Sequence, residues 1–243
     1  MKRRIFLSVF FVLLISLACK AFSGTPSMTA SENSPTSVPT QSATATPNTN
    51  QPVLGQILFQ DDFSDPNSGW TTTDQDFIAL DYFDGGYRAT VKRSYIASFS
   101  AFPNLQFDNV SIEADAQFLT GPNSSLFGLI CRATANPDLQ SGYQMLITPN
   151  GEASIVKITG VKAGQEKVLS SGTSPLVHAG AAMNHLRMNC SGDHISMYVN
   201  GERLVQVTDS DYPQGRVGFA FGANYDPGFQ VLFDNFVVRQ ANP

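Results

Sequence analysis

Two carboxylates, Glu113 and Asp115, stand two positions apart in a run where polar and apolar residues alternate. In a β-strand this spacing places both side chains on the same face. Two carboxyl groups about 5–5.5 Å apart can divide the nucleophile and acid roles of retaining glycoside hydrolysis. The next position on that face is Gln117, which adds no further acid. A solvated polar strand face is therefore the better interpretation, and we expect no catalytic residues.

The three histidines, His178, His185 and His194, offer no stronger constellation. None stands at metal-ligand spacing from another, and the sequence contains neither a Gly-x-Ser-x-Gly elbow nor a glycine-rich phosphate loop. The chemistry-bearing residues therefore favour a protein that binds rather than one that catalyses.

The N-terminus predicts export. A basic start at positions 2–4 precedes an apolar run over 5–17, which is too short to cross a hydrocarbon core of ~30 Å comfortably. This pattern indicates a signal peptide over 1–18. The segment 15–19 resembles a bacterial lipobox, which implies a lipid on Cys19 and an anchor on the outer side of a cell membrane. The alternatives are an ordinary cleaved signal peptide with an incidental cysteine, or an uncleaved anchor.

The charge balance argues against polyanionic partners. The chain has 15 basic and 20 acidic residues, a formal net charge of −5. Removal of the three basic residues at positions 2–4 leaves 12 against 20, a net charge of −8. Since no basic patch or arginine-rich run remains, we expect no nucleic acid partner, and membrane attachment would come from acyl chains alone.

Residues 19–55 form a stalk rich in Ser, Thr and Pro, with almost no large apolar side chain. Such a stretch buries too little surface to offset the entropy of ordering it. Its prolines favour extended conformations of about 3.1 Å per residue. We therefore expect a disordered spacer between the anchor and a globular domain over 56–243.

The globular part shows period-two alternation in short runs, separated by Gly, Asn, Asp and Pro. No long amphipathic helix is evident, although 175–188 could hold a short helical turn. This pattern predicts an all-β, two-sheet antiparallel jelly-roll sandwich. The Asn-Gly pairs at 150–151 and 200–201 indicate hairpins. The run 229–238 is apolar on both parities, so it should lie centrally and be covered on both faces, with the first run, 57–63, as its neighbour.

Cys131 and Cys190 both fall on the apolar parity of their strands. Because an exported protein meets an oxidising compartment, we expect them to form a disulfide. The alternative is a pair of buried free thiols. Alternation predicts the core-facing residues of four strands: Phe127, Leu129 and Cys131; Leu186, Met188 and Cys190; Ile195, Met197 and Val199; and Val217, Phe219 and Phe221. In the second of these runs, Arg187 and Asn189 should face away from the core.

Three stretches carry a resemblance to a known superfamily: the opening 59–70, the hairpin 186–201 that ends in Val-Asn-Gly, and the close 231–238. On these the domain resembles the concanavalin A-like lectins and glucanases. The superfamily includes lectins, laminin G-like modules and 3-keto-disaccharide hydrolases, so the resemblance specifies fold more than activity. Its glucanases use a Glu-x-Asp-x-x-Glu strand, and here Phe118 replaces the second Glu.

The resemblance also implies a structural calcium between the first and last strands. Asp234 matches the position of the family's ligand, and Gly86 or a residue near Asp62 could add backbone carbonyls. The alternative is that Asp234 hydrogen-bonds nearby backbone. Trp70, the single tryptophan, follows a turn and is interpreted as a packing residue.

We expect a non-catalytic, surface-displayed module for glycan or another extracellular polymer. Alternatives are an enzyme related to the 3-keto-disaccharide hydrolases and an envelope protein–protein interaction module. Sugar sites combine aromatic rings with planar polar groups. The candidate ligand-binding residues, which have such side chains on outward parities or near loops, are Arg88, Arg132, Tyr143, Gln144 and Tyr225.

Overall fold

The computed structural model describes residues 55–93, 96–101, 105–134, 141–160, 165–223 and 228–241. The signal segment, Cys19, the stalk up to residue 54 and Tyr225 lie outside these ranges. Within them, no helix is long and apolar enough to cross a membrane.

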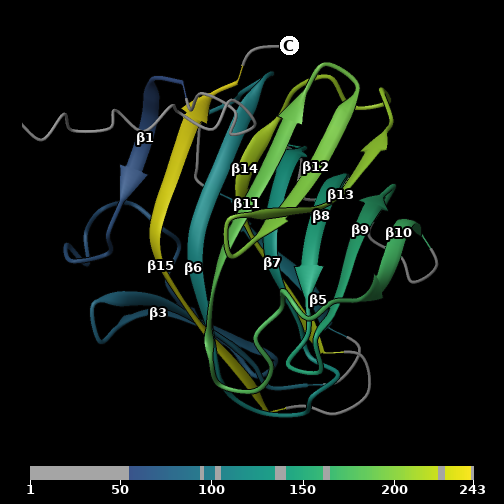
Figure 1. Ribbon diagram of the computed structural model, residues 1–243. Coiled ribbons are helices and arrows are strands. Elements are labelled where there is room, and N and C mark those ends of the chain that lie inside the picture. Colours follow the sequence, from purple (N-terminus) through teal and green to yellow (C-terminus); the bar gives the residue numbers. More distant parts are fainter. Residues whose placement is uncertain are drawn as a thin grey trace, which may run out of the picture. The chain divides into compact units, whose positions relative to one another are not determined.

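The domain is a sandwich of two antiparallel sheets, as the alternation predicted, and the described residues form no helix (Figure 1). The larger sheet has the order β13-β12-β11-β6-β15-β4-β3-β2, with β1 also paired to β15. Its strands are β1 (Ile57–Asp61), β2 (Thr73–Asp74), β3 (Ile78–Phe83), β4 (Gly86–Val91), β6 (Val110–Thr120), β11 (Met183–Ser191), β12 (His194–Val199), β13 (Glu202–Thr208) and β15 (Phe229–Gln240).

The smaller sheet has the order β10-β9-β8-β7-β14-β5 and packs its inner face on that of the larger sheet. Successive side chains of a strand point to opposite faces, so each strand gives alternate residues to the core between the sheets. The strands are β5 (Ile96–Ala101), β7 (Leu126–Ala133), β8 (Gly142–Ile147), β9 (Glu152–Ile158), β10 (Glu166–Thr173) and β14 (Arg216–Ala223).

The predicted core facings are confirmed. All twelve side chains that alternation assigned to the core of β7, β11, β12 and β14 are buried, with at most 2% of each exposed. The predicted disulfide is also present and joins β7 to β11, with Cα atoms of Cys131 and Cys190 6.7 Å apart. It therefore ties the two sheets together from inside the core.

Trp70 packs in the core, as predicted. Its ring stacks on Phe219 at 4.9 Å and meets Phe236 edge-on at 5.1 Å. Its indole N–H donates to Oδ2 of Asp61 at 3.0 Å, which satisfies the polar end of a buried ring. The loop between β1 and β2 is thus fixed by a central aromatic cluster.

The predicted hairpins are present. Asn200 and Gly201 both have positive φ, 51° and 89°, which suits a two-residue turn between β12 and β13. At 150–151, only Gly151 has positive φ, and the turn joins β8 to β9.

The expected helical turn at 175–188 is wrong. The segment forms a loop and then enters β11 at Met183. Asn184 supplies the physical reason: its side chain accepts from the N–H of His178 at 2.8 Å and donates to the carbonyl of His178 at 2.9 Å. These bonds satisfy backbone groups that a helical turn would otherwise pair.

The termini of the domain meet as expected, because β1 pairs with β15. β15 is central, between β6 on one side and β4 and β1 on the other. Its inward face is buried, whereas residues of its outward face, such as Leu232, Asp234 and Arg239, are half-buried rather than covered.

Candidate functional site

Arg132, a predicted ligand-binding residue, is buried at the end of β7, with 2% of its surface exposed. Its guanidinium donates to the backbone carbonyls of Asp108, Tyr212 and Gly192 at 2.9–3.3 Å. Arg132 has a left-handed φ of 53°. At the end of a strand, this backbone conformation turns the side chain away from the direction that regular alternation would give it. In this structure the guanidinium holds three loops together, and a ligand would reach it only after these bonds opened.

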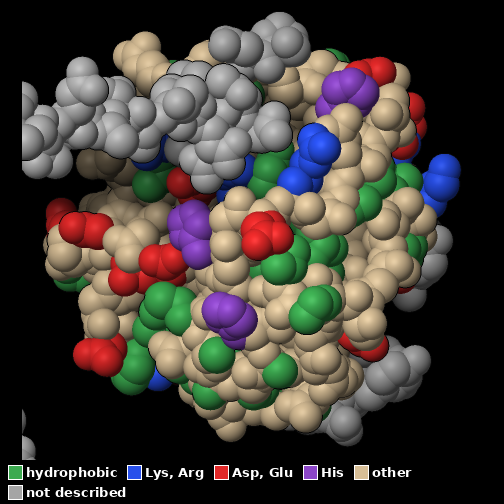
Figure 2. All heavy atoms as spheres, viewed as in Figure 1, with side chains coloured by type: hydrophobic (Ala, Val, Ile, Leu, Met, Phe, Trp, Pro, Cys, Tyr) green, Lys and Arg blue, Asp and Glu red, His purple; other side chains and the backbone are tan. Residues whose placement is uncertain are grey.

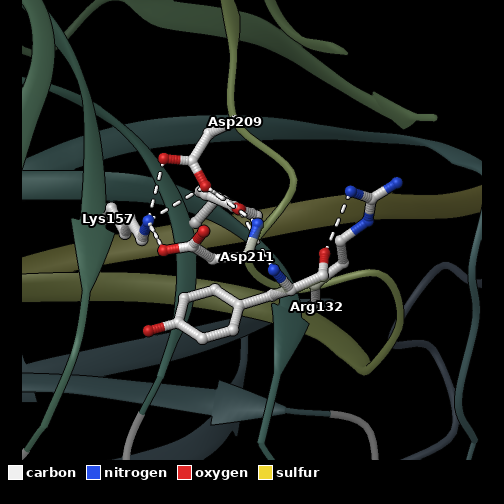
Figure 3. A network of polar contacts seen from close by, with 6 residues as sticks. Arg132, Lys157, Asp209 and Asp211 are labelled. Atoms are coloured by element: carbon white, nitrogen blue, oxygen red, sulfur yellow. Dashed lines mark hydrogen bonds and ion pairs between the residues drawn. The ribbon is translucent and has the colours of Figure 1, made fainter. Parts of the chain in front are cut away.

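An ion network lies next to Arg132, with Lys157 and Asp209 buried and Asp211 largely exposed. Figure 3 shows Lys157 pointing between Asp209 and Asp211, and its Nζ lies 2.8 Å from Oδ2 of Asp209. Burial alone would lower the pKa of Lys157, but hydrogen bonds and the charges of both aspartates raise it. Burial would raise the pKa of Asp209, and hydrogen bonds from Lys157 and Tyr143 bring it below its ordinary value. The network therefore clamps the β13–β14 loop onto β9.

Tyr143 belongs to the same clamp. Its side chain is fully buried and its hydroxyl donates to Oδ1 of Asp209. Burial, and then that hydrogen bond, raise the pKa of Tyr143 to about 12. Gln144, the next residue, is 7% exposed and points to the opposite face of the smaller sheet. The structure therefore does not bring these predicted residues to one accessible surface.

Arg88 lies on the outer face of the larger sheet. It donates to Asp81 through Nε at 3.0 Å and through a second nitrogen at 2.6 Å, and its guanidinium carbon lies 3.8 Å from the ring centre of Phe83. Phe83 is 42% exposed at the tip of the β3–β4 hairpin. Of the predicted ligand residues, Arg88 is thus the one that lies beside an exposed aromatic ring, while Tyr225 lies outside the described residues.

Asp234 lies where the calcium hypothesis requires, beside β4. A Cβ placed on Gly86 would come within 2.8 Å of the carbonyl oxygen of Phe233, so Gly86 and the last strand are in close contact. Burial, with the charges of Asp115 and Asp62, raises the pKa of Asp234. Across the described residues, no three acidic, histidine or cysteine side chains converge as metal ligands. A calcium ion at Asp234 would therefore need backbone carbonyls as its further ligands, and the calcium site stays a prediction.

A pocket of about 320 Å³ opens next to this position, where β1 meets β15. The register of β15 against β6 shifts between Asp234 and Val237, and Asn235 adopts a positive φ of 53°. Such a bulge re-aims side chains and often lies beside functional sites. The pocket is lined by Gln60, Asp61, Asp62, Asn235, Phe236 and Val237.

The sheet face beside the pocket is polar across four neighbouring strands, β12, β11, β6 and β15. Pairing sets Glu113 of β6 opposite Arg187 of β11, and Arg187 opposite Tyr198 of β12. Figure 2 shows carboxylates and a histidine gathered on this side of the molecule, over β15 and β6. We call this surface the polar face; it consists of the outward side chains Ser111, Glu113, Asp115, His185, Arg187, Asn189, Tyr198, Asn235 and Arg239.

His185 connects the two carboxylates of the polar face. Its Nδ1 lies 2.8 Å from Oδ1 of Asp115, and its Nε2 lies 3.8 Å from Oε2 of Glu113. Asn235, at the bulge, donates to Oδ2 of Asp115 at 2.9 Å. Asp115 is therefore held from both sides, whereas Oε1 of Glu113 has no hydrogen-bond partner within the described part of the chain.

Two arginines flank Glu113. The guanidinium carbon of Arg187 lies 3.8 Å from the ring centre of Tyr198, and Nε of Arg239 lies 3.8 Å from Oε1 of Glu113. Neither arginine Nε has a hydrogen-bond partner among the residues described. Buried polar atoms rarely lack a hydrogen-bond partner, so a cluster of atoms without one requires an explanation. Of the seven such atoms in the described residues, five lie on this face, on Ser111, Glu113, Arg187, Asn189 and Arg239.

The polar face was only partly visible in the sequence. Glu113 and Asp115 were recognised as sharing a strand face, and Arg187 as lying opposite the apolar parity of its strand. Asn189 was likewise recognised as facing away from the core, but Arg239 and the role of His185 were missed. Outward parity was the available signal, but it did not show that β6, β11, β12 and β15 are neighbours.

The arrangement suits an uncharged, oxygen-rich ligand. Hydroxyl groups can donate to a carboxylate and accept from guanidinium groups. The ring of Tyr198 is 9% exposed and has Arg187 against it, so it supports Arg187 rather than offering a stacking surface. The pocket lies within the lower part of the usual volume range for small-molecule sites.

Comparison with solved structures shows the same fold in carbohydrate-active proteins. A carbohydrate-binding module, CBM66 from Bacillus subtilis, matches with a TM-score of 0.56 and 18% identity, over 71% of this chain and 96% of that one. A Bacillus subtilis protein of unknown function with a galectin-like fold matches with a TM-score of 0.55 and 14% identity, over 77% and 97%.

A third match is a GH16 protein of a Bacteroides ovatus mixed-linkage glucan locus, in complex with a G4G4G3G product. Its TM-score is 0.54 at 11% identity, over 75% of this chain and 100% of that one. No family model matches the chain, and no curated protein matches it. At these identities the likeness shows the fold.

Proposed function

We propose that the protein is a non-catalytic glycan-binding module, displayed outside the cell on a lipid-anchored stalk. The ligand lies over the polar face, with one unit at the pocket between β1 and β15. The observation that carries this proposal is the cluster of buried polar atoms without a hydrogen-bond partner on Glu113, Arg187 and Arg239, which a hydroxyl-rich ligand or its bridging waters would satisfy once the side chains around them shift.

The comparisons support a glycan as the ligand class. Two of the matched proteins are a carbohydrate-binding module and a GH16 protein with a bound product, and they share this fold. Because function resides in sites rather than folds, glycan binding by this chain would depend on the polar face. That face combines a buried carboxylate, two arginines and an aromatic ring on one sheet.

The anchor rests on the N-terminal pattern: a basic start, an apolar run over 5–17 and Cys19 after small residues. Metabolic labelling with a palmitate analogue tests it, since Cys19→Ser would abolish label if Cys19 carries the lipid. Equal labelling of the variant would exclude this anchor.

The binding proposal is tested on a glycan array with the fragment Thr49–Pro243, which spans the compact unit. Arg187→Ala should weaken retention of the bound glycan class about tenfold, as expected when one hydrogen-bonding, ring-stacking anchor is lost. Arg93→Ala is the matched control, because Arg93 is 61% exposed and pairs with Asp76. An array without a bound glycan, or equal loss in both variants, would refute the proposal.

A second candidate is a glycoside-processing enzyme. It is favoured by one observation: His185 lies between Glu113 and Asp115 at the margin of the pocket. Release of sugar from any array-positive glycan, abolished by Glu113→Gln but not by Glu152→Gln on the smaller sheet, would establish this candidate. Intact glycan after prolonged incubation would exclude it for that ligand.

A further inference from the structure

The clamp around Lys157 holds an amine against a carboxyl group in a nearly water-free setting (Figure 3). The side chains of Lys157 and Asp209 are 7% and 12% exposed. Nζ of Lys157 lies 2.8 Å from Oδ2 and 3.0 Å from Oδ1 of Asp209. An amine and a carboxyl group can condense to an amide, and holding them in contact removes much of the entropic barrier to that reaction.

Two hydrogen-bond donors converge on one oxygen of Asp209. The hydroxyl of Tyr143 and the backbone N–H of Asp211 both donate to Oδ1, the latter at 3.1 Å. The N–H of Tyr212 donates to the hydroxyl oxygen of Tyr143 at 3.3 Å, which orients that hydroxyl towards Asp209. Fixed donors of this kind stabilise the negative charge that develops on a carbonyl oxygen when a nucleophile attacks. Oδ1 is therefore positioned to become the oxygen of an amide.

Asp211 supplies a group that can move protons. Its carboxylate contacts the same Nζ, and its side chain is 64% exposed, so it can also exchange protons with water. Burial alone would lower the pKa of Lys157, but hydrogen bonds and charges from both aspartates raise it. Because the neutral amine is the nucleophile, the ammonium must first give a proton to Asp211. Condensation should therefore be slow, and faster at alkaline pH.

We propose that Lys157 and Asp209 condense to form an intramolecular isopeptide bond. A bond forms between Nζ of Lys157 and Cγ of Asp209, and the bond between Cγ and Oδ2 breaks. Oδ2 leaves as water with the two protons that the ammonium loses, one of them carried by Asp211. An ammonium and a carboxylate thus give an amide and one water molecule, so that charge is conserved and no further reactant is needed.

The bond links β9 to the loop between β13 and β14. Lys157 belongs to the smaller sheet, whereas Asp209 directly follows a strand of the larger sheet. The two residues are 52 positions apart, so the bond closes a long loop of the chain. Together with the disulfide it gives the sandwich a second covalent closure, which restricts the unfolded chain further. This role is independent of any glycan.

Mass spectrometry of protease digests of the reduced mature protein tests the bond. After incubation at alkaline pH, the wild type should give a branched peptide that joins Lys157 to Asp209. This peptide should be lighter than its two component peptides together by one water molecule. Lys157→Arg, which keeps a cation in the clamp, should abolish it, and Asp211→Asn should slow its formation about a hundredfold. Lys92→Arg, at the exposed pair with Asp74, is the matched control and should leave it unchanged.

Two outcomes would overturn the isopeptide bond. The first is a wild type that is folded by circular dichroism and yields only linear peptides after prolonged alkaline incubation. The second is a loss of water that persists in Lys157→Arg, because it would then come from a cyclic imide at an aspartate. Equal rates in the wild type and in Asp211→Asn would overturn the part assigned to Asp211.

Discussion

The Nδ1 atom of His185 lies 2.8 Å from Oδ1 of Asp115, across the adjacent strands β11 and β6. These residues are directly opposite each other in the antiparallel register, so their side chains meet without distortion of either strand. Asp115 also accepts a hydrogen bond from Asn235, which lines the pocket. The contact therefore connects the centre of the larger sheet with the pocket wall.

We expect measurable coupling between His185 and Asp115. Alanine replacements, singly and together, should give an interaction energy of about 0.5–1 kcal/mol in urea unfolding, since the pair is only partly exposed. His194 and Asp193 provide the control, because that pair is 3.5 Å apart with both side chains more than half exposed. Additive effects at His185 and Asp115 would contradict the expectation.

Lys157→Met should be strongly destabilising. The substitution leaves Asp209, whose side chain is 12% exposed, without its cation, and breaking such a buried pair costs about 3–5 kcal/mol. Denaturant unfolding measures the change. Lys92→Met is the control: its pair with Asp74 is largely exposed and should contribute less than about 1 kcal/mol. Similar losses in the two variants would argue against a buried clamp.

Alkaline pH should destabilise the domain through Tyr143. Its folded pKa, about 12, lies above the ordinary value of 10.0, so its contribution is complete below pH 10 and is lost as pH rises from 10 to 12. Over that interval about 2 kcal/mol of unfolding free energy should disappear. The loss should be smaller in Tyr143→Phe, and ultraviolet absorbance should show one fewer late-titrating tyrosine in this variant than in the wild type, since burial also raises the pKa of Tyr212.

Reduction of the disulfide should lower stability substantially. Cys131 and Cys190 are 59 residues apart, and loop-closure entropy predicts a loss of about 4 kcal/mol when the bond opens. Urea unfolding with and without dithiothreitol tests this, and the Cys131→Ala, Cys190→Ala double variant should be insensitive to the reductant. A wild type that is equally stable in both conditions would contradict it.

Calcium, if it binds at Asp234, should raise the melting temperature of the domain, and EDTA should reverse the shift. Asp234→Asn should abolish the response, whereas Asp65→Asn, in the exposed loop after β1, should leave it unchanged. Identical melting curves in calcium and in EDTA would exclude a calcium site of useful affinity.

Much of the fold followed from local patterns. The direction of each side chain along a strand depends on backbone geometry alone, so alternation was sufficient to assign Leu129 and Met188 to the core. The Asn200–Gly201 turn was equally local, because only residues that tolerate positive φ suit it. The disulfide needed one further premise, that the protein meets an oxidising compartment.

The site depended on pairing between distant segments. Asp115 meets His185 from 70 residues away and Asn235 from 120 residues away, and no local pattern specifies those neighbours. The same limit explains why Arg132 and Tyr143 were expected on a binding surface. The strand parity of Arg132 and the place of Tyr143 near a loop were visible, but the loops that cover and bond them come from elsewhere in the chain.

The sequence by itself therefore determined the element types, the facing of the strands and the cysteine pair, since these follow from chain geometry over a few residues. Only the tertiary structure decided that β6, β11 and β15 are neighbours and that a bulge opens a pocket beside them. The physical reason is that strand order arises from packing of the whole sandwich, which outward-facing polar residues do little to specify.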